Sequence, residues 1–214
     1  HFVQEKHLKN VTQLTFGGEN AEAYWSFDNT MLTFQNTNKP KGLMCDQIFL
    51  LNSRDGYLNI DVNTYDTTRT SVWENTGKMI STGNGRTTCS FFMPGDSQII
   101  YATTHLFGDT CPANPPHIRG KYLWAIYPEY EIVIADMNGK IVKQLTKNKF
   151  YDAEAVVSPR GDKILFTSNR SGDLELYTMN LDGSNVKQIT NELGYDGGAN
   201  FSPDGSQIIW RASH

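Results

Sequence analysis

The sequence predicts an all-β protein, a β-propeller of four-stranded antiparallel blades with about three full blades and a partial one. Three observations predict this fold. Helical periodicity is weak throughout, short β-rich runs are separated by Gly, Asn, Asp and Thr, and one segment of the chain repeats. Four antiparallel strands that recur about every 40–45 residues are typical of propeller blades, whereas a sandwich does not repeat its sequence at that period.

The repeat is clearest in the second half of the chain. Residues 143–166 and 187–210 align without a gap at an offset of 44, and 10 of 24 positions are identical. Two weaker copies lie upstream, at residues 78–101 and 13–34. The anchors of the four copies are Phe27, Pro94, Pro159 and Pro203. The first two intervals are longer than the last because loops are inserted there.

Each copy divides into strands separated by turns. In the third copy the expected strands cover residues 153–158, 163–168, 174–179 and 186–190. Ser158-Pro159-Arg160-Gly161 and Asp182-Gly183 supply the turns, since Pro presets φ and Gly accepts the left-handed conformation. We expect one domain over residues 1–214. Its expected parts are a lone outer strand at 8–15, blades at 16–82, 83–147 and 148–191, and a partial blade at 192–214.

These motifs resemble the TolB-type β-propeller repeat, a WD-like repeat of bacterial proteins. The resemblance rests on Gln-Leu-Thr at 144–146, Asp-x-Glu-x-x-x-Ser-Pro-x-Gly at 152–161 and Leu-Tyr-x-Met-Asn-x-Asp-Gly at 176–183. It implies an extracytoplasmic protein (periplasmic, lipoprotein or secreted), such as part of a cell-envelope assembly. Six blades are usual in such proteins, so we expect the natural chain to continue past residue 214. A four-bladed ring with one short blade, or closure by a second copy, is the alternative.

Composition and motifs exclude several function classes. The chain has 19 basic and 23 acidic residues, a net charge of −4, which argues against a nucleic-acid partner. Its apolar runs are far shorter than the ~20 residues that a transmembrane helix needs. Neither a Gly-x-Ser-x-Gly elbow, a phosphate-binding loop, a dinucleotide glycine fingerprint nor a His-Glu-x-x-His motif occurs. No catalytic residue is therefore predicted, and a non-catalytic role is favoured over an enzyme.

Up-and-down strand connectivity predicts where recognition occurs. The connections that enter the innermost strands, and those between the second and third strands, lie on one face, which we call the upper face. These upper connections are long and varied: residues 36–46, 104–129, 169–173 and 191–198. Varied loops on a rigid scaffold are where binding usually takes place. We therefore expect a protein or peptide partner to bind at the upper face and the mouth of the central channel.

Polar residues recur at the start of each innermost strand. Asn20, Asp152 and Asp196 stand seven positions before the anchors, Glu22 and Glu154 stand five before them, and Arg86 is close by. Converging carboxylates predict a site for a basic peptide segment or a hard cation such as calcium. The alternative is structural, because such groups also cap backbone amides and hold ordered water in a channel. Apart from that calcium ion, no cofactor is expected.

The three cysteines form a second group on the upper face. A disulfide between two of Cys45, Cys89 and Cys111 is expected in an oxidising compartment, and free thiols are the alternative. His105 and His117 flank Cys111 and are further binding candidates. They also allow a Cys/His metal site, although the spacing fits no standard zinc pattern.

Three other roles compete with the binding scaffold. The resemblance extends to the propeller domains of prolyl-oligopeptidase-like peptidases, so the chain is alternatively part of a larger hydrolase. A metal-dependent propeller enzyme would use Asp152, Glu154 and Asp196. The third role is a purely structural part of an envelope assembly. Recurring aromatics are expected in the core between blades: Trp25, Phe92, Phe166, Phe201 and Trp210.

Overall fold

In the part of the chain that the structure describes, each of four sheets is antiparallel and follows the order of the chain. The computed structural model describes residues 6, 13–52, 77–116, 118–120, 123 and 125–213. Three sheets have four strands and the last has two. The expected outer strand at 8–15 falls mostly outside the described residues, and residues 13–16 form no strand.

The first sheet consists of β1 (Glu19–Trp25), β2 (Met31–Asn38), β3 (Leu43–Asn52) and β4 (Lys78–Met79), with the short 3₁₀ turn η1 (Lys39–Lys41). The second consists of β5 (Thr87–Phe92), β6 (Gln98–Thr103), β7 (Glu131–Asp136) and β8 (Ile141–Gln144). The third consists of β9 (Asp152–Val157), β10 (Ile164–Ser168), β11 (Glu175–Met179) and β12 (Lys187–Gln188). The last pair is β13 (Tyr195–Phe201) and β14 (Ile208–Ser213).

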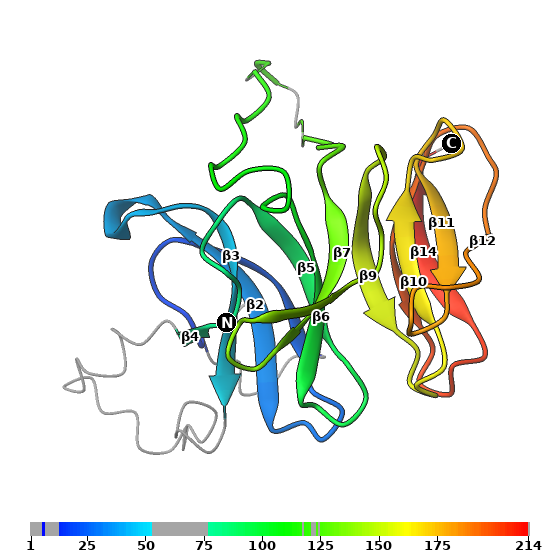
Figure 1. The fold of residues 1–214 in the computed structure, drawn as a ribbon, viewed down its shortest axis with the longest axis horizontal. Coiled ribbons are helices and arrows are strands. Elements are labelled where there is room, and N and C mark those ends of the chain that lie inside the picture. Colours follow the sequence, from blue (N-terminus) through cyan, green and yellow to red (C-terminus); the bar gives the residue numbers. More distant parts are fainter. Residues whose placement is uncertain are drawn as a thin grey trace.

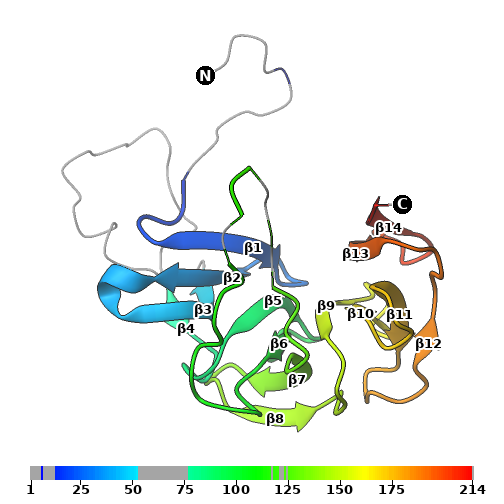
Figure 2. The same cartoon turned by 90° about the horizontal axis from the view of Figure 1, so that it is seen from above.

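The sheets are arranged radially as propeller blades (Figure 1). Seen from above, they form an arc in which β1, β5, β9 and β13 lie at the inner edge (Figure 2). β5 packs beside β1 and β9, and β9 packs beside β13. The predicted fold class, three full blades and a partial one, is confirmed.

The hydrophobic core lies between successive blades. The interface of the first two blades includes Ile48, Phe92 and Tyr101, and that of the second and third includes Ile132 and Phe166. All five are fully buried. Two of the expected core aromatics differ, because they lie on the end blades of the arc, where no further described blade packs against them. Trp25 is 49% exposed and Trp210 is 42% exposed.

A repeated hydrogen bond explains the Gln-Leu-Thr motif. The hydroxyls of Ser81, Thr146 and Thr190 accept hydrogen bonds from the third-strand amides of Ile48, Ile132 and Leu176 over 2.9, 2.8 and 2.9 Å. Each hydroxyl therefore fastens the connection that leaves the outermost strand to the strand beside it. This fixes where the chain turns inward to start the next blade.

Each innermost strand carries a β-bulge at the same place. The register shifts between Ala21 and Tyr24 in β1, and at the corresponding residues of β5, β9 and β13. The residue five positions before each anchor has a left-handed backbone there: Glu22 (φ 51°), Cys89 (φ 48°), Glu154 (φ 57°) and Gly198 (φ 58°). Three of the four are not glycine, so the surrounding pairing holds a conformation that L residues adopt rarely.

Within the described residues, no helix has the length and apolar character required to cross a membrane.

Candidate functional site

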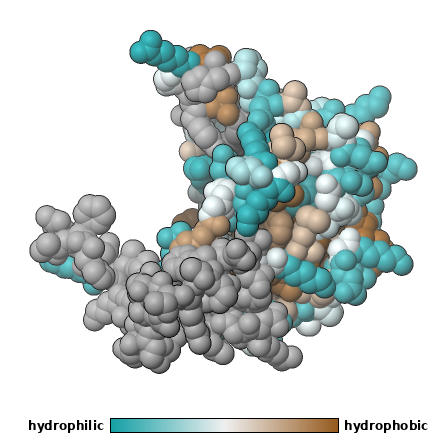
Figure 3. Space-filling view, turned by 90° about the vertical axis from the view of Figure 1, so that its left-hand side faces the viewer, coloured by the Kyte–Doolittle hydropathy of each residue, from teal (hydrophilic) through white to brown (hydrophobic). Residues whose placement is uncertain are grey.

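A cavity of about 900 Å³ opens at the upper end of the innermost strands. We call it the mouth cavity. Its lining comes from the first three blades, from Arg211 of β14 and from the 104–129 loop. The surface is hollowed beside the part of the molecule that projects upward (Figure 3). The bulges contribute to the cavity directly, since Glu22, Cys89 and Glu154 all line it.

Glu154 is fixed at the junction of the third blade and the last strand pair. One carboxylate oxygen, Oε2, accepts hydrogen bonds from the Thr167 hydroxyl at 2.7 Å and the Gly198 amide at 2.8 Å. The Tyr195 hydroxyl donates to the same carboxylate at 3.1 Å. Arg211 stacks on the Tyr195 ring, 5.2 Å from its centroid. The guanidinium of Arg211 therefore lies over the ring of Tyr195, whose hydroxyl is hydrogen-bonded to the Glu154 carboxylate.

Glu22 occupies the equivalent bulge of the first blade and is exposed. It accepts a 2.8 Å hydrogen bond from the Tyr24 hydroxyl. Burial, followed by the charge of Glu22, raises the pKa of Tyr24 well above its usual range. This tyrosine therefore remains a neutral donor to Glu22 at every physiological pH.

Two tyrosines form the inner wall of the mouth cavity. Tyr130 and Tyr151 are each only 4% exposed, and both line the cavity. Their rings meet edge to face at 5.8 Å. Neither hydroxyl has a hydrogen-bond partner among the described residues. Burial is the main cause that raises the pKa of both residues, so both hydroxyls stay protonated.

Cys89 lies at the bulge of the second blade and is the free cysteine of the described residues. Burial, and then the charges of Glu154 and Glu22, raise the pKa of its thiol well above the usual value. The thiolate is the reactive form of cysteine, so Cys89 is not an activated nucleophile.

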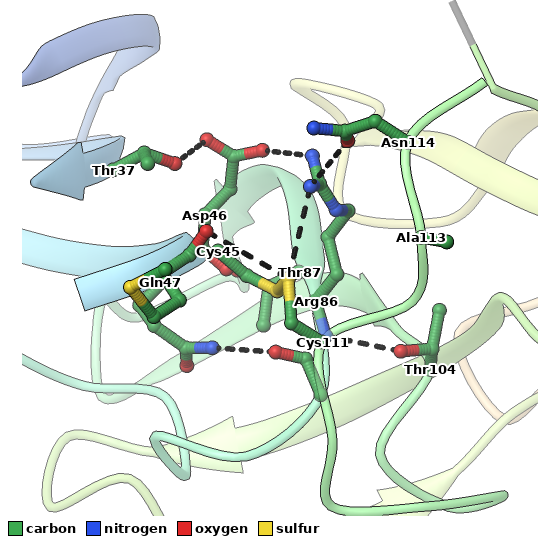
Figure 4. The surroundings of a disulfide bond; sticks show 12 residues. Thr37, Cys45, Asp46, Gln47, Arg86, Thr87, Thr104, Cys111, Ala113 and Asn114 are labelled. Carbon is green, nitrogen blue, oxygen red and sulfur yellow. Dashed lines mark hydrogen bonds and ion pairs between the residues drawn. A yellow bond between two sulfur atoms is a disulfide. The ribbon is translucent and has the colours of Figure 1, made fainter. Parts of the chain in front are cut away.

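A disulfide between Cys45 and Cys111 anchors the 104–129 loop to β3 at the rim of the cavity (Figure 4). The two Cα atoms are 5.8 Å apart. Arg86 reinforces the rim: its guanidinium forms an ion pair with Asp46 and donates to the Asn114 side chain, both at 2.9 Å. The loop is therefore held at two points, by the disulfide at Cys111 and by the hydrogen bond from Arg86 to Asn114.

The structure separates the residues that the sequence grouped together. Asn20, Glu22, Arg86 and Glu154 line the cavity, whereas Asp152 and Asp196 do not. Asp152 is fully buried and forms an ion pair with Arg170 at 2.8 Å.

The other candidate residues also lie away from the cavity. Asp196 is buried and accepts a 3.0 Å hydrogen bond from the indole of Trp210. His105 is half-buried outside the cavity, with Thr82 and Thr103 beside its ring. His117 lies outside the described residues.

The acidic, histidine and cysteine side chains do not gather into a metal-binding group among the described residues. In the part of the chain that the structure describes, no group of three or more His, Cys, Asp and Glu residues is arranged to hold a metal ion. The carboxylates of Asp152 and Asp196 are engaged by Arg170 and Trp210, and neither residue lines the cavity with Glu154.

Comparison with known proteins identifies the repeat. Residues 127–214 match the family described as the TolB beta propeller domain. This part of the chain is therefore similar to the TolB-type β-propeller repeat. No curated protein sequence matches the chain.

Solved structures extend the likeness to nearly the whole chain. Putative TolB from Agrobacterium tumefaciens is 18% identical, with a TM-score of 0.61 over 93% of this chain and 57% of that one. TolB from Acinetobacter baumannii is 17% identical, with a TM-score of 0.57 over 90% of this chain and 37% of that one. The chain thus spans about half or less of these TolB-type relatives. A puromycin-hydrolyzing peptidase of Mycobacterium tuberculosis is 12% identical, with a TM-score of 0.53 over 88% of this chain and 27% of that one.

The sequence analysis missed the tyrosines of the mouth cavity. The repeat offered a signal for one of these tyrosines, Tyr151. Tyr151 and Tyr195 occupy the same position in the two clearest copies, eight residues before their anchors. Tyr130 has no such signal, since it ends an inserted loop whose path only the fold determines.

Proposed function

We propose that this chain is a non-catalytic β-propeller scaffold that binds a protein or peptide partner in the mouth cavity. The observation that supports this most is the cavity itself, about 900 Å³ in volume and lined by three blades and an anchored loop. Concave sites of this size with a few convergent polar groups are the usual form of a binding site. The raised pKa of the Cys89 thiol favours binding over covalent catalysis there.

We further propose an extracytoplasmic location. The Cys45–Cys111 disulfide supports it, because disulfides persist in oxidising compartments. The likeness to TolB proteins supports the same location and a place in a cell-envelope assembly.

A peptide-display selection tests the proposed function. A random peptide library would be selected on the immobilised protein and on Ala21→Trp, which places a bulky ring in the cavity wall. Ala23→Trp is the matched control, since Ala23 lies on the same strand outside the lining. We expect peptides that bind the parent protein and the control but not Ala21→Trp. Peptides that bind all three equally would contradict the proposal.

The second candidate function is the propeller domain of a larger hydrolase. The likeness to the puromycin-hydrolyzing peptidase favours it. Assay of the full gene product for cleavage of aminoacyl amides tests it, with this chain alone as the control. Cleavage that needs the full product would support this role.

A further inference from the structure

We propose that the mouth cavity binds a basic side chain, arginine or lysine, presented by a peptide partner. The basic group would lie between Glu22 and Glu154, against the inner wall of the cavity. This inference rests on the proposed function and adds the chemical class of the ligand.

The inner wall offers hydrogen-bonding groups that the fold leaves unused. Tyr130 and Tyr151 are 96% buried, and neither hydroxyl has a partner among the described residues. Unlike the Tyr101 hydroxyl, neither of these hydroxyls is a fully buried atom without a partner, so both are open to the cavity, where each can donate and accept a hydrogen bond. Since both residues line the cavity, a ligand there supplies what the protein lacks.

The charges of the cavity favour a cation. Glu22 and Glu154 project from the bulges of the first and third blades, and both face it. Their combined negative potential is felt by Cys89, whose pKa both carboxylates raise after burial. A carboxylate gains most from a charged donor, which forms shorter and stronger hydrogen bonds than a neutral one.

The basic residues of the lining do not cancel this potential completely. Arg86 is committed to Asp46 at the rim, where it also holds Asn114. Arg211 lines the cavity and stacks over Tyr195; its hydrogen bond to Tyr195, followed by the charges of Tyr195, Glu154 and Glu22, raises its pKa, so it already offsets part of the negative potential. Lys39 is exposed on η1. The described lining holds the carboxylates of Glu19, Glu22, Asp46 and Glu154 against these three basic side chains.

The occupant is a peptide side chain because of the size and walls of the cavity. A volume of about 900 Å³ exceeds what one side chain fills, so the neighbouring residues of a segment fit as well. Tyrosine faces attract a guanidinium or an ammonium through the ring quadrupole. The Arg211–Tyr195 stack is the same interaction within the chain.

Nuclear magnetic resonance titration with short capped peptides tests the inference. The probes are acetyl-Gly-Arg-Gly-amide, the lysine analogue, and the citrulline analogue, which keeps the shape of arginine without its charge. We expect the arginine and lysine peptides to bind at least about tenfold more tightly than the citrulline peptide, the effect of one charge-assisted hydrogen bond. Equal affinities would overturn the inference.

Variants localise the binding. Glu22→Gln should weaken the arginine peptide about tenfold, and Tyr130→Phe and Tyr151→Phe about three- to tenfold each. Glu192→Gln is the control for charge, since Glu192 is exposed outside the lining. Tyr101→Phe is the control for the hydroxyl, because its unpartnered hydroxyl lies in the core. Equal effects in variants and controls would overturn the inference.

The display selection separates this inference from the proposed function. Cavity-dependent peptides enriched in arginine or lysine support both. Cavity-dependent peptides without that enrichment would leave the proposed function standing and overturn the basic-ligand inference. The absence of cavity-dependent peptides, together with equal titrations, would overturn both.

Discussion

Single residues decide which carboxylates are available for binding. Asp152 and Glu154 are two positions apart on β9, yet one is buried in an ion pair and the other faces the mouth cavity. The bulge at Glu154 turns the strand, so strict alternation of side chains fails at this point. The carboxylates that recur in each blade therefore divide into structural and cavity-facing sets.

Removal of the Asp152 carboxylate should destabilise the protein. Asp152→Ala leaves Arg170 without its partner and Asn148 without its acceptor. We expect a loss of about 3–5 kcal/mol in the free energy of unfolding, as for other broken buried pairs. Urea denaturation measures it, with the exposed Asp162→Asn as the control. A loss below about 1 kcal/mol would show that the pair contributes little.

The half-buried His105 should make stability depend on pH. Burial lowers the pKa of His105 from its usual value, and the charge of Asp109 opposes this. The folded state then binds the proton less readily than the unfolded state, whose histidine pKa is about 6.5. The contribution of His105 to the free energy of unfolding is complete above about pH 6.5 and is lost as the pH falls through the pKa of the folded state.

We expect the free energy of unfolding to fall less between about pH 7 and pH 5 in His105→Asn than in the parent protein. Denaturation at several pH values measures this. A proton titration of the His105 ring supplies the check, and a pKa above about 6.5 would contradict the expectation.

At the scale of elements, the strands are held by repeated side-chain bonds to the backbone. Thr146 is buried, and its hydroxyl accepts a hydrogen bond from the Ile132 amide. The backbone amide of the adjacent Leu145 donates a hydrogen bond to the Ile132 carbonyl. The sequence motif Gln-Leu-Thr is therefore a structural signature. The backbone amide of its apolar residue and the hydroxyl of its threonine both form hydrogen bonds to the third strand, beside the outermost strand of the blade.

Thr146→Val should destabilise the protein with little change of shape. The substitution keeps the volume of the side chain but leaves the Ile132 amide without its acceptor, which costs about 1–3 kcal/mol. Thermal and urea denaturation measure it. Thr178→Val on β11 is the control, because no described residue forms a hydrogen bond with that hydroxyl.

The disulfide stabilises both the fold and the rim of the cavity. It closes a loop across a sequence separation of 66 residues. Loop-closure entropy then predicts a loss of about 4 kcal/mol in Cys45→Ser with Cys111→Ser, or on reduction. Denaturation with and without reductant measures it, and mass spectrometry verifies the bond. Cys89→Ser is the control, and equal losses in both variants would contradict the assignment.

At the scale of the whole molecule, the blades are joined by contacts at both ends of their innermost strands. On the upper side, Glu154 connects the third blade to Tyr195 and Gly198. On the lower side, Asp96 accepts the amides of Phe27 and Asp28 from the neighbouring turn. These polar contacts fix the angle between neighbouring blades, and the apolar side chains fill the space between them.

Gly197→Ala should uncouple the last strand pair from the third blade. A Cβ at Gly197 would lie 2.3 Å from the Tyr195 hydroxyl and 2.6 Å from Glu154 Oε2, so both side chains must shift and their hydrogen bond is disturbed. We expect faster amide hydrogen exchange in β13 and β14, with β5 to β8 unchanged. Gly108→Ala is the control, since a Cβ there meets open space. Unchanged exchange throughout would contradict this coupling.

The blades could be predicted from the amino-acid pattern alone, because their turns and strands depend on local chemistry. The Ser158–Gly161 turn forms as its residues require, with the Gly161 amide bonded to the Ser158 carbonyl at 2.8 Å. The period of the repeat likewise identified the four-stranded unit and the propeller. The conserved spacing of carboxylates predicted that polar groups lie at the channel mouth, and Glu22 and Glu154 do line it.

Only the tertiary structure decided which residues share the cavity. The meeting of Tyr130 with Tyr151 and the joining of Cys45 to Cys111 connect residues from different blades or loops. Such contacts depend on the angle between blades and on the path of the inserted loop. Both are set by packing over the whole molecule, which leaves no local pattern in the chain.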